Sequence, residues 1–287
     1  METVGIDALE EQMKRSSLEE QQGLSLPSPS LFVLPDMNTV IESSRALKEL
    51  FDLHDNELDL EQVKVARKYV LDHGLPDDLT ISTSTLRSKA WKSFLGVPLS
   101  TLSIDHYEIK ACQSAFDAKI RDDTFRTFKK NADFWSKINE SMLLRILNAA
   151  AADHGYVQGM NVLLGPFLLV LPEVDAYYCF DKLLSHHIPT YVMKNLDGVH
   201  RGSALASKCL AVVDKPLHSH IINKLRDFSV FSIRFIMTLL ANTQPLSEVI
   251  KLWDAIFAFG SHFGILVFCA YLSQLRERIL AEKSGYK

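Results

Sequence analysis

A succession of apolar segments with helical spacing, joined by short polar stretches, sets the strongest limit on the fold of this chain. Residues such as Val40, Ile41, Leu47, Leu50 and Phe51 recur at the spacing of an amphipathic helix. No segment alternates apolar and polar residues for long enough to indicate a β-strand, and no repeat of fixed period points to a solenoid. The sequence therefore predicts an all-α protein.

The pattern along the chain divides it into four parts. Residues 1–36 mix Glu, Gln and Ser with three prolines and show little apolar periodicity, so we expect a disordered arm, with one short helix over 6–16. Residues 37–74 are predicted to form a helical hairpin, because Asp59 can cap its second helix and a glycine can end it. The remaining parts are a main helical domain over 75–280 and a tail over 281–287.

The apolar period of the main domain predicts ten consecutive helices with short joints. After the glycine at 155, a tight turn should place Gln158 at the beginning of an apolar helix, where its side chain can point outward. The expected helices cover about 84–95, 105–118, 134–154, 157–170, 174–185, 202–213, 216–224, 228–242, 245–259 and 262–280.

Composition excludes several classes of function. A formal net charge of -4 and a pI near 6.2 give no electrostatic reason to expect nucleic acid, whose binders usually carry a basic stripe. The apolar stretches 162–171 and 256–272 are too short or too interrupted to span a membrane. The four cysteines lack C-x-x-C spacing, and the amino terminus does not resemble a secretory leader. These features predict a cytoplasmic protein with reduced thiols.

Other kinds of site are poorly supported. The densest group of metal-ligand types is His186-His187 with Asp181, but adjacent helical side chains point about 100° apart, so we predict no metal site. No phosphate-binding G-x-x-x-x-G-K-[ST] motif is present, and no serine or cysteine has the setting of a nucleophile. A helical metallohydrolase stays a third hypothesis, which elemental analysis can test.

Two short polar segments remain as candidates for chemistry. In Ile120-Arg-Asp-Asp-Thr-Phe-Arg126-Thr, the residues Ile120, Asp123 and Arg126 fall three apart, so they lie on neighbouring positions of one helical face. Asp123 can then hold Arg126 or the local backbone, although such a pair can also be an ordinary surface ion pair. In Tyr156-Val-Gln-Gly-Met, Gln158 can likewise be part of a simple turn.

Together the two segments resemble the arginine and glutamine motifs of the TBC family of GTPase activators, and this resemblance implies a role in GTP hydrolysis. Negative charge develops on the phosphoryl oxygens and the attacking water has to be positioned. A guanidinium such as that of Arg126 can stabilise the charge, because it stays protonated and presents a planar set of donors. A carboxamide such as that of Gln158 can orient the water through a donor and an acceptor.

In this order and with its flanking motifs, the chain from about 75 to 280 resembles the TBC domain of Rab-type GTPase-activating proteins. The resemblance implies a multi-helical TBC fold, Arg126 as an arginine finger and Gln158 in place of the GTPase's own glutamine. By the same match, the finger motifs include Ile120, Asp123, Thr127, Tyr156 and Gly159 as supporting residues. The flanking motifs imply structural roles, with GTPase contact as an alternative, for Arg87, Trp91, Arg234, Trp253 and Asp254.

Within that family the chain is most similar to the small TBC proteins of the mitotic-exit and septation checkpoint. The resemblance implies an enzyme regulator rather than an enzyme, acting on a Rab-like small GTPase in checkpoint control or vesicle trafficking. It also implies a second, scaffolding subunit and a location at the spindle pole. The chain needs no cofactor of its own, since GTP and Mg²⁺ come with the GTPase.

Departures from the family pattern leave a rival hypothesis open. This chain has Phe128 and Lys129 where many members have a proline after the arginine, and Val162 where many have an acid. The segment 242–244 replaces a usual acidic stretch. These changes concern substrate choice and efficiency. The rival is a GTPase-binding or scaffold module with little catalysis of its own, active only with a second subunit.

Overall fold

The computed structural model describes residues 37–53, 58–100 and 102–281, and every regular element in these ranges is a helix. The predicted arm over 1–36, its helix over 6–16 and residues 282–287 of the tail lie outside the described residues. The α-helices are α2 (Met37–Asp52), α3 (Leu60–His73), α4 (Leu86–Leu95), α5 (Ile104–Lys110), α6 (Asp117–Arg126), α7 (Ala132–Lys137), α8 (Glu140–His154), α9 (Met160–Val170), α10 (Glu173–Lys182), α11 (Asp197–Val213), α12 (Lys215–Leu225), α13 (Phe228–Met237), α14 (Leu246–Phe259), α15 (Phe263–Gln274) and α16 (Arg276–Ala281). A π-helical turn, η1 (Leu183–His187), and a 3₁₀ turn, η2 (Pro189–Tyr191), connect α10 to α11.

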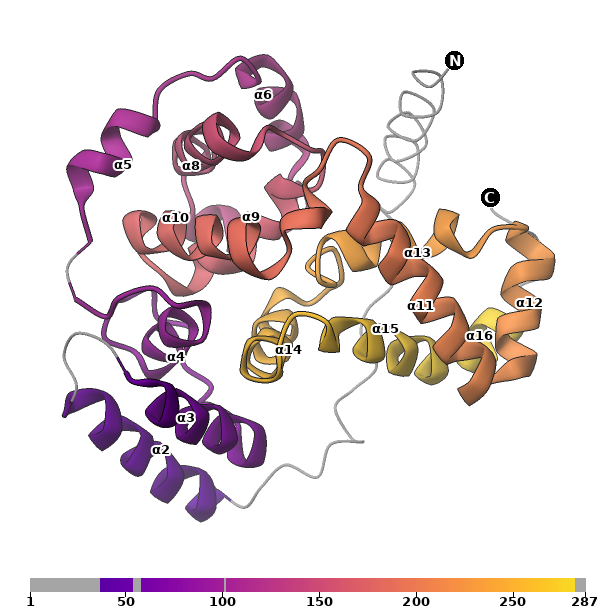
Figure 1. Ribbon diagram of the computed structural model, residues 1–287, viewed down its shortest axis with the longest axis horizontal. Coiled ribbons are helices and arrows are strands. Elements are labelled where there is room, and N and C mark those ends of the chain that lie inside the picture. The colour runs from indigo at the N-terminus through magenta and orange to yellow at the C-terminus, as the bar shows by residue number, and fades with distance from the viewer. Residues whose placement is uncertain (1–36, 54–57, 101, 282–287) are drawn as a thin grey trace.

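Two hydrophobic cores lie side by side (Figure 1). The larger one joins helices from α2 to α10 with α14, and the smaller one joins α11, α12, α13 and α15. Val157, in the loop between α8 and α9, packs against both cores. The loop that carries Gln158 therefore lies where the two cores meet.

The amino-terminal helices α2 and α3 pack against each other, and α3 packs on α14. Asp59 caps α3, because its side chain accepts a hydrogen bond from the Gln62 backbone N–H at 2.9 Å while the Gln62 side chain accepts from the Asp59 N–H at 2.8 Å. Gly74 follows with φ of 72°, a conformation that favours glycine. The sequence signals for this helix thus correspond to its observed ends.

The predicted helix over 105–118 is wrong, because the chain breaks between α5 and α6. Asn148 of α8 accepts hydrogen bonds from the Ser114 backbone N–H at 2.9 Å and from its hydroxyl at 2.8 Å. Its amide nitrogen donates to Asp117, the first residue of α6, at 2.9 Å. One side chain of α8 thereby fixes the start of α6, the helix that carries Arg126.

The predicted helix over 228–242 is too long, since α13 ends at Met237. Leu239 and Leu240 have φ values of 48° and 63°, and both side chains are buried. Leu239 belongs to the larger core and Leu240 to the smaller one. The chain leaves the helical path because these neighbours fill different cores.

Several other boundaries also differ from the predictions. The segment 134–154 forms two helices, with Asn139 capping α8 through the Ser141 N–H at 3.0 Å. The segment 262–280 breaks at Leu275, next to the ion pair of Arg276 with Asp214 at 2.7 Å. The helix expected at 157 begins at Met160, and the one expected at 202 begins at Asp197.

A buried ion pair connects α4 to α14 in the larger core. Arg87 donates from Nε to both oxygens of Asp254 at 3.0 and 3.1 Å, and the Trp91 indole donates to the same carboxylate at 2.8 Å. Trp253 is also buried and donates to the Leu239 carbonyl at 2.9 Å, which holds the loop after α13. These four side chains therefore hold the fold together, and the suggested GTPase contact does not fit their burial.

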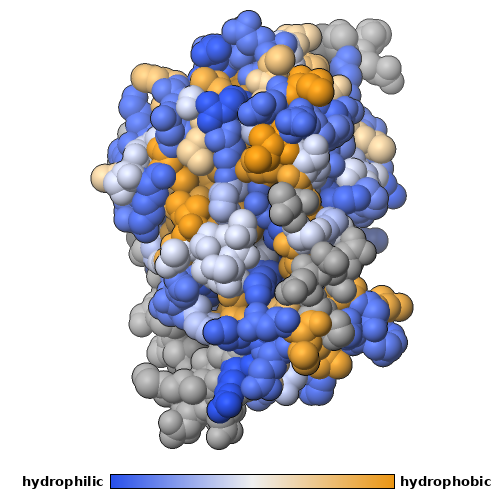
Figure 2. All heavy atoms as spheres, turned by 90° about the vertical axis from the view of Figure 1, so that its left-hand side faces the viewer, coloured by the Kyte–Doolittle hydropathy of each residue, from blue (hydrophilic) through white to orange (hydrophobic). Residues whose placement is uncertain are grey.

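The surface of the molecule is mainly polar on the side that carries α5, with hydrophobic groups scattered across it (Figure 2). Among the described residues, no helix combines the length and the apolar character needed to cross a bilayer.

Candidate functional site

Arg126 is the last residue of α6, on a helix whose inner face is fixed in the core. Ile120, Asp123 and Thr124 are buried, whereas the Arg126 side chain is 29% exposed. The spacing of three places Asp123 and Arg126 together, and the Arg126 Nη2 donates to Asp123 Oδ1. The helix therefore presents a paired but accessible guanidinium.

Asp123 connects the two polar segments that the sequence singled out. Its second carboxylate oxygen accepts a hydrogen bond from the Tyr156 hydroxyl at 2.8 Å, across 33 positions of sequence. Burial raises the pKa of Tyr156 well above its usual value, and the charge of Asp123 adds to this effect. Tyr156 therefore stays protonated at physiological pH. It donates to one oxygen of the Asp123 carboxylate, while Arg126 donates to the other.

Asn161, which the sequence analysis did not assign, joins the same two segments through the backbone. Its side-chain nitrogen donates to Thr127 Oγ1 at 2.7 Å and to the Asp123 carbonyl at 3.3 Å. Its side-chain oxygen accepts from the Gly159 N–H at 3.1 Å. The sequence offered one signal for this role of Asn161, a carboxamide in the first turn of an otherwise apolar helix, α9. A buried amide needs several hydrogen-bond partners, so such a residue is expected to join neighbouring segments.

Gly159 has a conformation and a position that exclude larger residues. Its φ is 107°, and a Cβ atom there would lie 3.0 Å from Met237 Cε of α13. The glutamine-bearing loop thus packs closely on the smaller core while Asn161 ties it to the larger one. The positive φ favours glycine, and a larger residue would also have to displace the flexible end of the Met237 side chain.

Gln158 does not point outward as predicted, since its side chain is buried with a relative exposure of 7%. Its Oε1 atom is buried and accepts no hydrogen bond. The preceding residue, Val157, packs against both cores, so Gln158 lies at their junction rather than on an open surface. A buried acceptor without a donor is costly, so the amide gains by turning toward a partner.

Phe128, where many family members have a proline nearby, anchors the loop after Arg126. Its backbone φ is 45°, and its ring occupies the space above Gly165 of α9. A Cβ atom on Gly165 would lie 2.3 Å from the Phe128 ring, which no packing allows. The position of the segment after Arg126 therefore depends on a glycine 37 residues beyond Phe128.

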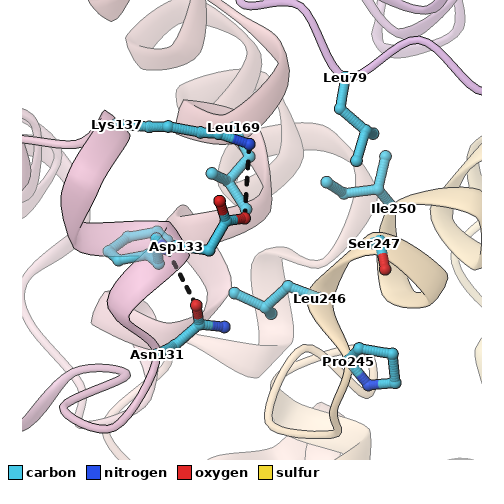
Figure 3. Close-up of a pocket in the computed structure, with 10 residues that line it drawn as sticks. Leu79, Asn131, Asp133, Lys137, Leu169, Pro245, Leu246, Ser247 and Ile250 are labelled. Carbon is cyan, nitrogen blue, oxygen red and sulfur yellow. Dashed lines mark hydrogen bonds and ion pairs between the residues drawn. The ribbon is translucent and has the colours of Figure 1, made fainter.

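A pocket of about 210 Å³ lies between α7, the segment before α4 and the start of α14 (Figure 3). Its floor is apolar, and its polar rim is internally paired, with Asp133 contacting Lys137 at 3.4 Å and Asn131 accepting from the Phe134 N–H at 2.9 Å. Arg126 and Gln158 do not line it. The pocket is therefore separate from the site built around Asp123.

The remaining candidate side chains lie elsewhere. Arg234 of α13 is half-buried, and its guanidinium lies 4.7 Å from the centre of the Phe235 ring. His186 and His187 contact different partners, the Ser185 hydroxyl and the Leu95 carbonyl. Within the part of the chain that the structure describes, no three His, Cys, Asp or Glu side chains gather as metal ligands would.

The arrangement combines an accessible guanidinium at the end of α6 with a carboxamide in the loop before α9, and both segments share the Asp123 and Asn161 network. Neither Arg126 nor Gln158 is suited to exchange protons at neutral pH, so the pair can stabilise charge and orient groups rather than act as acid or base. A multi-helical domain that holds an accessible arginine at a helix end and a glutamine in a neighbouring loop is suited to assist a reaction on another molecule.

Comparison with known proteins identifies the class. A model of the Rab-GTPase-TBC domain matches residues 84–280, so the chain belongs to this family of GTPase activators. The fold agrees, because the crystal structure of the Ypt/Rab-GAP domain of Gyp1p superposes with a TM-score of 0.68 at 20% identity, covering 85% of this chain and 88% of that one. The TBC domain of the Chlamydomonas flagellar RabGAP gives a TM-score of 0.60 at 18% identity, covering 86% of each chain.

Curated relatives are more similar in sequence. Cell division control protein 16 of Schizosaccharomyces pombe is 38% identical over 206 residues, covering 70% of this chain and 68% of its own length. The putative mitotic check point protein BUB2 of Dictyostelium discoideum is 36% identical over 233 residues, covering 76% and 63%. The mitotic check point protein BUB2 of Saccharomyces cerevisiae is 36% identical over 182 residues, covering 58% and 60%. The matched regions thus span about two thirds of the length of these relatives.

Proposed function

We propose that this protein stimulates GTP hydrolysis on a Rab-like small GTPase by a dual-finger mechanism. Arg126 enters beside the γ-phosphate and stabilises the charge that develops there, while Gln158 orients the attacking water in place of the GTPase's own glutamine. GTP and Mg²⁺ are carried by the partner, so the chain acts as a regulator that supplies residues to another protein's active site.

One observation carries this proposal: a single buried network joins the two finger motifs. Asp123 contacts Arg126 and Tyr156, and Asn161 contacts Thr127 and Gly159, so Arg126 and Gln158 belong to one supported unit. Support of this kind matters because small displacements of a catalytic group cost much of its effect.

The buried position of Gln158 adds a conformational step to the mechanism. In the free protein its acceptor oxygen is buried without a donor, and Arg126 contacts Asp123. When the GTPase binds, the γ-phosphate competes with Asp123 for the guanidinium, and the carboxamide rotates toward the water that needs a partner. The carboxamide exchanges a position without a donor for one with a partner, whereas the guanidinium exchanges one anionic partner, Asp123, for another, the phosphate.

The biological setting follows from the relatives as a proposal. Proteins named for cell division control and for the mitotic check point are 36–38% identical to this chain over 58–76% of its length. We therefore assign the protein to control of mitotic exit, with vesicle trafficking as the alternative. The corresponding locations are the cytoplasm and the spindle pole, where a scaffolding subunit joins it.

The rival function is a GTPase-binding module that is catalytically weak without a second subunit. The observation that favours it is the 7% exposure of Gln158, since a finger that stays buried cannot reach a nucleotide. Under this alternative, a scaffolding subunit is needed to move the loop between α8 and α9.

Single-turnover GTP hydrolysis across a panel of Rab-like GTPases tests the proposal. Wild type should stimulate at least one member, and Arg126→Ala and Gln158→Ala should each reduce the stimulation at least roughly tenfold, given the size of finger effects elsewhere. Both variants should remain folded, as thermal unfolding can check. Full stimulation by Arg126→Ala would refute the mechanism, and stimulation only with an added scaffold would favour the rival.

A further inference from the structure

Phe125, the residue before Arg126, presents a large apolar ring to solvent. Its relative exposure of 69% is the highest of any phenylalanine in the described ranges. Single exposed apolar residues are common on protein surfaces, so exposure alone has no functional meaning. Its functional meaning comes from the position of Phe125 next to Arg126 and from the contact of its side chain with Lys129.

Phe125 differs from the other residues on the solvent-exposed face of α6. The positions that face solvent along this helix are Ala118, Arg121, Asp122 and Phe125, which are spaced three or four apart. The inner face is fixed by Ile120, Asp123 and Thr124. Small or charged side chains thus occupy the exposed face until the last turn of the helix, where a phenylalanine lies next to the finger.

A contact with Lys129 favours one orientation of the ring before any partner binds. The Lys129 ammonium lies 4.5 Å from the centre of the Phe125 ring, a cation–π contact across the turn that follows α6. An apolar group that is already ordered loses little conformational entropy on binding. Phe125 and Lys129 together form a preorganised contact beside Arg126.

We propose that Phe125 is a docking and specificity residue, whose ring packs on an apolar patch of the GTPase surface next to the nucleotide. This inference rests on the proposed function. Phe125 and Arg126 are consecutive residues in the last turn of α6, and both side chains are accessible, so a GTPase that receives Arg126 comes close to this end of the helix. Aromatic side chains are enriched among the residues that dominate protein interfaces. Lys129 favours an acidic border on that patch.

This role separates binding from catalysis. The ring contacts the GTPase before and during hydrolysis alike, so it contributes uniform binding and does not act in the chemical step. Arg126 acts on the developing charge and thus on the maximal rate. Loss of Phe125 should weaken binding, so the half-saturating concentration should rise while the maximal rate stays nearly unchanged.

The test is single-turnover hydrolysis by the GTP-loaded panel member that wild type stimulates best, with the full chain titrated over it. Phe125→Ala should raise the half-saturating concentration about 10- to 30-fold, typical of an aromatic hot spot, with the maximal rate within about twofold of wild type. Phe125→Tyr should recover most of the loss, because it keeps an aromatic ring. Ile109→Ala on α5 is the matched control, since Ile109 is 77% exposed and lies outside the finger network.

The outcomes separate the two proposals. A wild-type chain that stimulates no GTPase overturns the proposed function, and the docking role with it. Stimulation by wild type with an unchanged half-saturating concentration in Phe125→Ala overturns the docking role alone. A reduced maximal rate at unchanged half-saturation also contradicts it, because the residue would then position Arg126. Thermal unfolding of Phe125→Ala at the wild-type temperature establishes that the fold is intact.

Discussion

Replacing Gly165 of α9 by alanine should move the segment that follows Arg126, the last residue of α6. The added Cβ atom would lie 2.3 Å from Cε2 and 3.0 Å from Cζ of Phe128. Carbon atoms in contact lie about 3.5–4.0 Å apart, so the ring has to shift by more than about 1 Å. Phe128 is two residues from Arg126 in a left-handed conformation, so the shift displaces the finger loop.

The magnitude has a stability component and an activity component. Overpacking of this kind costs about 1–3 kcal/mol of unfolding free energy. For a protein of this size, that loss corresponds to a fall of about 2–10 °C in the unfolding temperature. A displacement of about 1 Å can reduce catalysis by about 10²-fold, so we expect stimulated GTP hydrolysis to fall more than tenfold.

A matched control and a double variant separate this effect from a general cost of mutation. At Gly264 in α15 a Cβ atom would lie 3.7 Å from its nearest neighbours, Ile256 and Leu239, so Gly264→Ala should leave stability and activity unchanged. Combining Gly165→Ala with Phe128→Leu should cost less than the sum of the two single changes, as calorimetry can measure. A stable, fully active Gly165→Ala, or strictly additive costs, would refute the reasoning.

Two further predictions concern stability. Arg87→Ala leaves the buried Asp254 carboxylate without its cation. Urea unfolding should then show a loss of about 3–5 kcal/mol in unfolding free energy, and Arg87→Lys should lose less. A loss below about 1 kcal/mol in Arg87→Ala would contradict the role of this pair. Burial raises the pKa of Tyr107, Tyr156 and Tyr177, so above about pH 10 the unfolded chain releases protons that the folded chain retains. Stability should then fall as pH rises, and Tyr156→Phe should reduce that slope by about 1.4 kcal/mol per pH unit; an equal slope in urea titrations from pH 8 to 11 would exclude the assignment.

Local signals predicted the helical class and the two motifs, because both depend on residues close in sequence. The spacing of Asp123 and Arg126 is a property of one helix, and the caps at Asp59 and Gly74 act within a few positions. The family resemblance added the arginine and glutamine roles, which remain predictions for this chain.

Features that depend on contacts between distant segments could not be predicted. Nothing near Ser114 indicates that Asn148 interrupts the helix there, and nothing near Leu239 indicates that the next leucine turns to a second core. Nothing near Gln158 indicates that its side chain is buried where the two cores meet. Such contacts are selected by the packing of the whole chain, which overrides local helical preference.

The central claim is that Arg126 and Gln158 together complete the active site of another protein. The most direct test uses a Rab-like GTPase whose own catalytic glutamine has been replaced by leucine, assayed for single-turnover hydrolysis with wild type, Gln158→Ala and Arg126→Ala. The account predicts that wild type still stimulates this GTPase and that each variant loses at least about 90% of that stimulation. Stimulation of the unmodified GTPase alone, with none of the leucine variant, would show that Gln158 does not replace the missing glutamine.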